Sequence, residues 1–167
     1  MDFVGWLRRL FLSEVVSEAD QIAAVSRLVG HRFRNPRLLG LGLSHRSYMR
    51  TQEKGSDSYE RLEFLGDSVL GLVISEQLYR DRPGETEGNL TKTKAMLVNE
   101  TTLAQVGREI GLNNFILISP EEEKSGGRDR NSIIADAFEA VIGAVYLDGG
   151  IGPAREFILR QLYSRRD

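Results

Sequence analysis

The segment YERLEFLGDSVLGLVISEQLY, residues 59–79, sets acidic side chains into a nearly continuous apolar helical pattern. Its apolar residues recur on almost every side of a helix, which predicts a helix buried on most sides. Glu60, Glu63 and Asp67 interrupt this pattern at spacings of three and four, so they share one helical face. A chain that buries such a helix must also compensate for the buried charge of its carboxylates.

A second apolar segment, SIIADAFEAVIGAVYL at 132–147, carries Asp136 and Glu139 three residues apart. Burying a carboxylate without a partner costs several kcal/mol, so both segments require a cation nearby. Arg61 cannot supply it for its own helix, because adjacent residues on a helix do not face each other. The cation is therefore either an arginine from elsewhere in the fold or a metal ion.

An all-oxygen ligand set on two helices suits Mg²⁺ or Mn²⁺ rather than zinc or copper. The sequence contains no Cys, which excludes thiolate ligands, disulfides and a cysteine nucleophile. Neither His31 nor His45 follows a Glu by three positions, so the Glu-x-x-His pattern of di-iron bundles is absent. No phosphate-binding GxxxxGK loop or GxSxG motif is present either.

The length of 167 residues, 41% hydrophobic and 28% charged, predicts one folded domain. Helical periodicity, capping residues and Pro and Gly positions predict an all-α chain. The expected helices are 20–29, 36–43, 58–79, 86–98, 100–110, a helix capped by Asn131 or Ser132 that ends at Gly149-Gly150, and 153–163. Residues 115–118 have strand propensity but no evident partner strand, and Glu121 to Arg130 is predicted to be a polar loop.

Residues 1–17 are predicted to form an amphipathic extension, with Phe3, Trp6, Leu7 and Leu10 at helical spacing. Arg8 and Arg9 interrupt its apolar run, and no stretch reaches the roughly 20 apolar residues that span a membrane. Packing on the domain or on a partner, rather than on a membrane surface, is expected. A cytoplasmic location without membrane association fits both this pattern and the absence of Cys.

The net charge of −2 conceals a segregation of charges along the chain. Residues 21–52 hold six arginines and no acid, whereas 53–67 hold five acids against Lys54 and Arg61. Such a chain can offer a polyanion a basic surface beside an acidic cluster, although the arginines could equally lie scattered on a solvated face.

The block ERLEFLGDSVLG at 60–71 resembles the signature of the ribonuclease III family of double-strand-specific endoribonucleases. LSHRSY (43–48), EGNLTK (87–92), KSGG (124–127) and SIIADAFEAVIGAVYLDGG (132–150) are similar to its other blocks, in the same order and spacing. The resemblance implies the family's helical, dimeric endonuclease domain over 18–164. The C-terminal double-stranded-RNA-binding domain of most bacterial members is not expected in this chain.

The resemblance also implies roles for particular residues. Its metal-binding and catalytic carboxylates fall on Glu63, Asp67, Asp136 and Glu139, the residues that the burial argument isolates. Glu60 and Glu87 match auxiliary acidic positions, and Phe64 matches an apolar residue that enters the partner subunit at the dimer interface. RNA contacts are predicted for Arg46, Lys124, Arg128 and Arg130, whereas His45 is expected to make a structural hydrogen bond. Tyr59 stands where the family commonly has Asn.

The implied function is Mg²⁺-dependent cleavage of double-stranded RNA, with Mn²⁺ as a substitute and no small-molecule cofactor. Products would carry 5′-phosphate and 3′-hydroxyl ends with short 3′ overhangs, cut by a homodimer during rRNA or mRNA precursor processing. Alternatives are a non-catalytic scaffold that binds double-stranded RNA and a metal-dependent phosphatase acting on small nucleotides.

Overall fold

The computed structural model describes residues 18–51 and 59–163, and the regular elements of this part of the chain are helical. The predicted amphipathic extension at 1–17 lies outside the described residues. The helices are α2 (Glu18–Val29), α3 (Pro36–Gly42), α4 (Arg46–Met49), α5 (Glu60–Asp81), α6 (Glu87–Leu97), α7 (Glu100–Glu109), α8 (Pro120–Lys124), α9 (Asn131–Gly149) and α10 (Ile151–Ile158). Short 3₁₀ turns η1 (Leu112–Phe115) and η2 (Gly127–Asp129) and a π-helical segment η3 (Leu159–Tyr163) complete them. The all-α prediction is confirmed.

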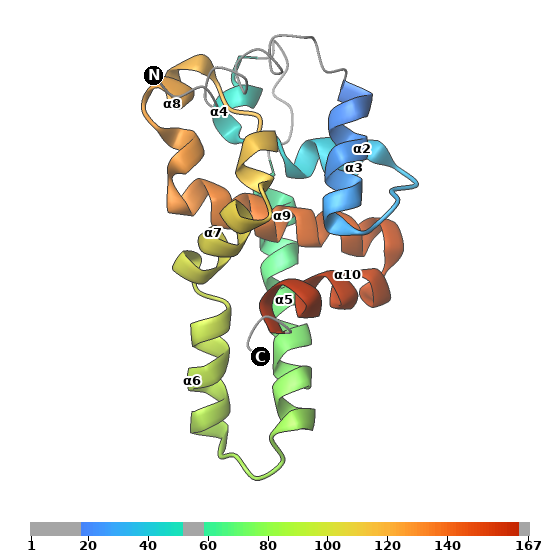
Figure 1. The fold of residues 1–167 in the computed structure, drawn as a ribbon, viewed down its shortest axis with the longest axis vertical. Helices are drawn as coiled ribbons and strands as arrows, with labels where there is room; N and C mark the ends of the chain where they lie inside the picture. The colour runs from blue at the N-terminus through green and yellow to red at the C-terminus, as the bar shows by residue number, and fades with distance from the viewer. Residues whose placement is uncertain (1–17, 52–58, 164–167) are drawn as a thin grey trace.

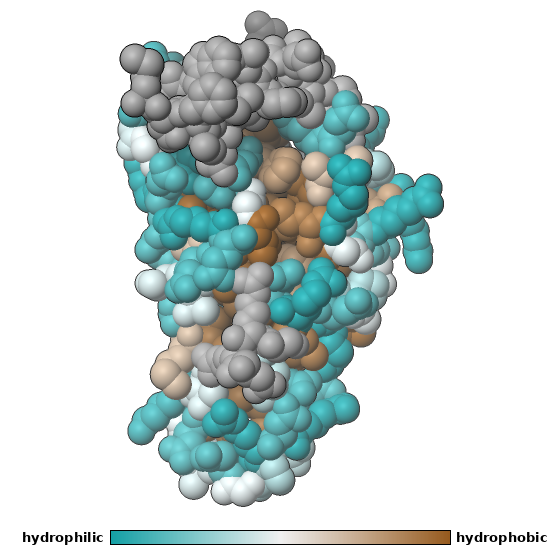
Figure 2. Space-filling model, in the orientation of Figure 1, coloured by the Kyte–Doolittle hydropathy of each residue, from teal (hydrophilic) through white to brown (hydrophobic). Residues whose placement is uncertain are grey.

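Helix α9 forms the centre of the fold and crosses α5, with α3, α7 and α10 packed against it (Figure 1). Its residues from Ile133 to Val145 are almost all buried, as the apolar pattern predicts. Helices α5 and α6 extend together to one end of the molecule, where a turn joins them (Figure 1). Hydrophilic residues cover that end, whereas hydrophobic residues are visible across the middle of the face shown in Figure 2.

Several predicted helix ends are confirmed by their caps. Asn35, Thr86 and Asn99 each accept a hydrogen bond from a backbone N–H in the first turn of the helix that follows. Gly30 and Gly111 follow α2 and α7 with φ of 74° and 77°, a conformation that glycine adopts without strain.

Three local predictions need correction. Helix α9 begins at Asn131, so the residue before it is Arg130, and neither Asn131 nor Ser132 is the N-cap. The predicted loop at 121–130 contains α8, which Ser119 caps by accepting from the N–H of Glu122, and η2. Residues 115–118 form no strand; a single bridge joins Leu117 to Ser44, flanked by hydrogen bonds from Leu117 N to Leu43 O (2.8 Å) and from His45 N to Leu117 O (3.0 Å).

The prediction that α5 is buried on most sides is wrong for one of its faces. Phe64, Leu72 and Tyr79 are 78%, 59% and 75% exposed. Their spacings of eight and seven residues place them on one stripe of the helix. The opposite face, which includes Leu62, Leu70 and Val73, packs into the core. The apolar residues of α5 therefore form two faces. One packs into the core, and the other contacts no partner within the described residues.

No helix in the described ranges combines the length and the apolar character needed to cross a membrane.

Candidate metal centre

The backbones of α5 and α9 touch where the two helices cross. A Cβ atom on Gly66 would lie 1.8 Å from the carbonyl oxygen of Glu139, and one on Gly143 would lie 2.2 Å from the carbonyl oxygen of Leu62. Any side chain at either glycine would therefore force the helices apart. This close crossing brings the first turns of α5 against the first half of α9, which are the segments that carry the predicted carboxylates.

Three of the four predicted metal ligands meet at this crossing. Glu63, Asp136 and Glu139 each offer a carboxylate oxygen, and these oxygens lie within 4.8 Å of one another. All three residues are partly buried, and none makes an ion pair or a side-chain hydrogen bond within the described part of the chain. The arginine that could have neutralised them is thus not found among the described residues, so the ion-pair alternative has no support here.

Burial and mutual repulsion raise the pKa values of these carboxyl groups and so favour their protonated forms. Burial, then the charges of Asp67, Glu63 and Asp136, raises the pKa of Glu139 to about 8. Burial, then Asp136, Glu60 and Asp67, raises the pKa of Glu63 to about 7.

The same causes raise the pKa of Asp136 to about 6, with burial first and the charge of Glu100 on α7 second. Arg46 acts in the opposite direction on Asp136, without overcoming the burial. Clustered carboxylates with raised pKa values and no cationic partner are typical of functional sites.

The fourth predicted ligand, Asp67, is exposed and lies outside the group of three. It is nevertheless close enough to be the largest electrostatic influence on Glu139. Four residues separate Asp67 from Glu63 on α5, so both project from the face that meets α9. Asp67 therefore borders the site and faces solvent, where a hydrated cation could reach it.

The two auxiliary acidic residues lie in different places. Glu60 is exposed at the first position of α5, with its Oε1 3.9 Å from Nη1 of Arg46. Glu87 begins α6, beyond the turn at the far end of α5. The length of α5 between Glu63 and Asp81 is roughly 27 Å at 1.5 Å per residue, so Glu87 is remote from the three carboxylates of its own chain.

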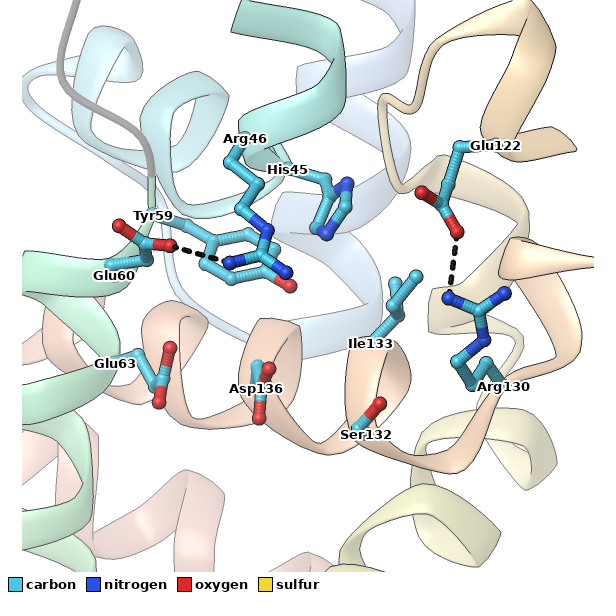
Figure 3. A pocket seen from close by; sticks show the side chains of 10 residues that line it. All are labelled: His45, Arg46, Tyr59, Glu60, Glu63, Glu122, Arg130, Ser132, Ile133 and Asp136. Carbon is cyan, nitrogen blue, oxygen red and sulfur yellow. Dashed lines mark hydrogen bonds and ion pairs between the residues drawn. The ribbon is translucent and has the colours of Figure 1, made fainter.

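A cavity of about 480 Å³ opens beside the carboxylates (Figure 3). Glu63 from α5 and Asp136 from α9 lie along one side of it, and Arg46 and His45 from the start of α4 lie opposite. Arg130 and Glu122 border its other end, paired at 2.8 Å. The cavity thus holds carboxylates and guanidinium groups side by side.

The predicted RNA-binding residues differ in how many contacts fix their side chains. Arg46 is largely exposed, and within residues 18–51 and 59–163 its one ion pair is the long contact with Glu60. Arg128 pairs with Glu123 and donates to the backbone carbonyls of Asn113 and Ile116 at 2.7 and 3.0 Å, so its guanidinium joins η2 to η1. Lys124 is exposed in the last turn of α8.

The structural hydrogen bond expected of His45 is confirmed. Its Nδ1 lies 2.8 Å from the Ser47 hydroxyl and accepts from the N–H of Ser47, which caps α4. Burial lowers the pKa of His45 from its ordinary value.

Three features of the site were not predicted. In the sequence, Gly66 and Gly143 are indistinguishable from other glycines within helices. The one signal for a helix crossing is that each lies in an apolar helix, and that signal does not show that the two glycines face each other. Tyr59, noted as a departure from the family pattern, proves to be buried against the cavity. Its hydroxyl has no hydrogen-bond partner in the part of the chain that the structure describes.

The donor set fits a divalent cation. Three partly buried carboxylates, without an ion-pair partner in the described ranges, form an oxygen-only group, which suits Mg²⁺ or Mn²⁺. The positive charge of such an ion would replace the missing counter-charge and lower the three pKa values. Enzymes that act on phosphate esters commonly hold their divalent metals through oxygen ligands of this kind.

Comparisons with known proteins identify the family. The profile described as Ribonuclease-III-like matches residues 35–165. Over 139 residues, 83% of this chain and 57% of the relative, the chain is 45% identical to Ribonuclease 3 of Coxiella burnetii (strain Dugway 5J108-111). It is 49% identical over 143 residues to Ribonuclease 3 of Alkalilimnicola ehrlichii, which covers 86% of this chain and 60% of that relative. The chain belongs to the ribonuclease-III-like family.

A solved structure gives the same result for the fold. The nuclease domain of Ribonuclease III from Campylobacter jejuni matches with a TM-score of 0.81 at 39% identity, covering 87% of this chain and 98% of that one. The description of that structure refers to a region involved in dimer formation. The chain spans less than two thirds of the length of the curated relatives reported above.

Proposed function

We propose that the chain is a Mg²⁺-dependent endoribonuclease that cleaves double-stranded RNA. The observation that carries this proposal is the convergence of Glu63, Asp136 and Glu139 within 4.8 Å, without an ion-pair partner among the described residues, in a chain of the ribonuclease-III-like family. The catalytic set comprises these three residues and Asp67. Mn²⁺ is the expected substitute for Mg²⁺, and no small-molecule cofactor is required.

In the proposed mechanism the four carboxylates hold the cation, which when bound supplies an activated water and stabilises the leaving oxygen of the phosphodiester. Glu63 and Glu139 come from helices fixed by a glycine crossing, so their positions change little as substrate enters. Arg46 and Arg130, at the two ends of the cavity, are placed to contact RNA phosphates. The products are 5′-phosphate and 3′-hydroxyl ends.

Recognition of the duplex would follow its A-form shape, phosphates and 2′-hydroxyls rather than base identity. Lys124 and Arg128 belong to the proposed RNA surface, with Arg128 also bracing η2. The cellular role we infer is processing of rRNA or mRNA precursors in the cytoplasm.

We further propose that the chain acts as a homodimer whose two sites each cut one strand and leave short 3′ overhangs. The exposed stripe of Phe64, Leu72 and Tyr79 on α5 supports this proposal, because an apolar stripe on one helix face is typical of a protein interface. Phe64→Glu is expected to yield monomers in light-scattering chromatography. Leu147→Glu, at an exposed leucine of α9 rather than α5, should leave the dimer intact.

The direct test is incubation of the purified protein with an end-labelled RNA duplex at low salt. Separate samples contain Mg²⁺, Ca²⁺ or EDTA. Staggered products with 5′-phosphates, formed with Mg²⁺ alone, support the proposal. Duplex binding without cleavage under every condition would instead favour a scaffold. Hydrolysis of mononucleotides without duplex cleavage would favour a phosphatase.

A further inference from the structure

Tyr59 is a fixed residue at the start of α5. It is 2% exposed, and its backbone N–H donates to the Ser44 carbonyl at 3.1 Å. Its own carbonyl accepts from the N–H of Glu63 at 2.9 Å, so it lies directly before the turn that presents this metal ligand. Its ring packs 5.6 Å from the ring of His45, measured between centroids.

The hydroxyl of Tyr59 is the anomaly. It is buried and has no hydrogen-bond partner in the described part of the chain. Leaving such a group unsatisfied costs about 1–3 kcal/mol, and native proteins rarely do so without a functional reason. A phenylalanine would fill the same space without that cost.

The surroundings of the hydroxyl indicate what it is for. The ring projects into the wall of the cavity, with Arg46 and Asp136 beside it (Figure 3). After burial, Asp136 and then Glu63 exert the largest electrostatic influence on the hydroxyl, and together they raise the pKa of Tyr59 far above its ordinary value. An ordinary tyrosine hydroxyl is protonated at neutral pH, so this group can donate to an acceptor beside it.

Other groups that can donate also line the cavity, among them Ser132 and Arg46, whose guanidinium is 63% exposed beside Glu60. The Tyr59 hydroxyl differs from them because it is fully buried and lacks a partner among the described residues. A carboxylate that binds a metal through one oxygen needs a donor for the other, and such outer contacts orient the ligand.

We propose that Tyr59 is a positioning residue, whose O–H donates to the Asp136 carboxylate when that carboxylate binds a divalent cation. The inference rests on the proposed function in that it requires the metal site. Under this proposal the buried hydroxyl has a hydrogen-bond acceptor when the metal is bound and lacks one when it is not.

The test compares Tyr59→Phe with the unchanged protein and with Tyr146→Phe, a half-buried tyrosine on α9 ten residues beyond Asp136. Affinity for Mn²⁺ alone is measured by calorimetry on EDTA-treated protein, and thermal unfolding is followed without metal. Tyr59→Phe should bind Mn²⁺ about 10-fold more weakly. Its Tm without metal should equal or exceed that of the unchanged protein. Tyr146→Phe should retain the full affinity.

A purely structural tyrosine would lower the metal-free Tm instead, and that result with unchanged Mn²⁺ affinity overturns the inference. Duplex cleavage supplies a further readout, since Tyr59→Phe should need more Mn²⁺ for half-maximal rate and recover at saturating Mn²⁺. Equal Mn²⁺ affinities overturn the role of Tyr59 alone. Failure of the unchanged protein to bind Mn²⁺ overturns the proposed function as well.

Discussion

Helix α9 carries two partly buried acidic sites, and they are built in opposite ways. Near its C-terminus, Asp148 accepts from the backbone N–H groups of Arg34 and Asn35 at 2.9 and 2.8 Å and lies 2.8 Å from Nε2 of His31. Near its N-terminus, Asp136 and Glu139 have no such donors within the described residues. The distance between Asp136 and Asp148 along the helix is about 18 Å.

The pKa values express this difference. Burial alone would raise the pKa of Asp148, but the donated hydrogen bonds from Arg34, Asn35 and His31 outweigh it and hold the pKa below its ordinary value. At Asp136 and Glu139 burial prevails, and the pKa values rise to about 6 and about 8. Asp148 is thus a carboxylate whose charge is satisfied by protein donors. Asp136 and Glu139 lack such donors among the described residues, as a pair that awaits a cation would.

The largest expected effect is on catalysis. Glu139→Gln keeps the shape of the side chain but removes a charge from the metal group. RNA cleavage should fall at least roughly 1,000-fold, because stabilisation of charge in the transition state depends on the metal. Cleavage of a labelled duplex under single-turnover conditions measures the effect. Glu156→Gln, at an exposed residue of α10, is the matched control and should cut normally.

The next prediction is that substitutions at the two acidic sites change the free energy of unfolding differently. Asp148→Ala removes three hydrogen bonds to a charged acceptor and should lower the free energy of unfolding by about 2 kcal/mol or more. Asp136→Ala should leave it unchanged or increase it in metal-free buffer, since it relieves repulsion. Urea unfolding of both variants in EDTA measures this. Equal destabilisation would show that Asp136 has protein partners after all.

A smaller effect concerns pH. Glu139 binds its proton more tightly in the folded state, so the stability it contributes is complete below its ordinary pKa of 4.5 and is lost as pH rises towards about 8. Asp148 behaves oppositely, with stability present above 3.8 and lost as pH falls. In EDTA, the Tm of the unchanged protein should therefore decline between pH 5 and 8 more than that of Glu139→Gln. A parallel pH profile for both proteins would contradict the raised pKa.

Much of the fold could be predicted because its signals are local. The caps at Asn99 and Thr86 and the glycines after α2 and α7 mark helix ends by short-range chemistry. The burial of α5 could not be judged this way, since the sequence does not distinguish an apolar face that packs on α9 from one left for another surface. The start of α9 was misjudged because two good capping residues stand beside Arg130 and neither is used as a cap.

The candidate site also has features that the sequence predicts and features that it does not. Glu63, Asp136 and Glu139 could be isolated by asking where buried carboxylates find a counter-charge. The crossing at Gly66 and Gly143 and the unsatisfied hydroxyl of Tyr59 depend on contacts between distant segments, which no spacing in the chain records. The pairing of Arg128 with Glu123 and with the carbonyls of Asn113 and Ile116 likewise depends on how the loop folds.

The most direct test of the central claim, that the three carboxylates form a metal site, is thermal unfolding at pH 7.5 across a titration with Mn²⁺ or Mg²⁺. A ligand at 100 times its Kd stabilises the folded state by about 2.7 kcal/mol. The account predicts a concentration-dependent rise in Tm for the unchanged protein and for Asp148→Ala, and no rise for Glu139→Gln. An equal rise in Glu139→Gln, or none in the unchanged protein, would contradict it.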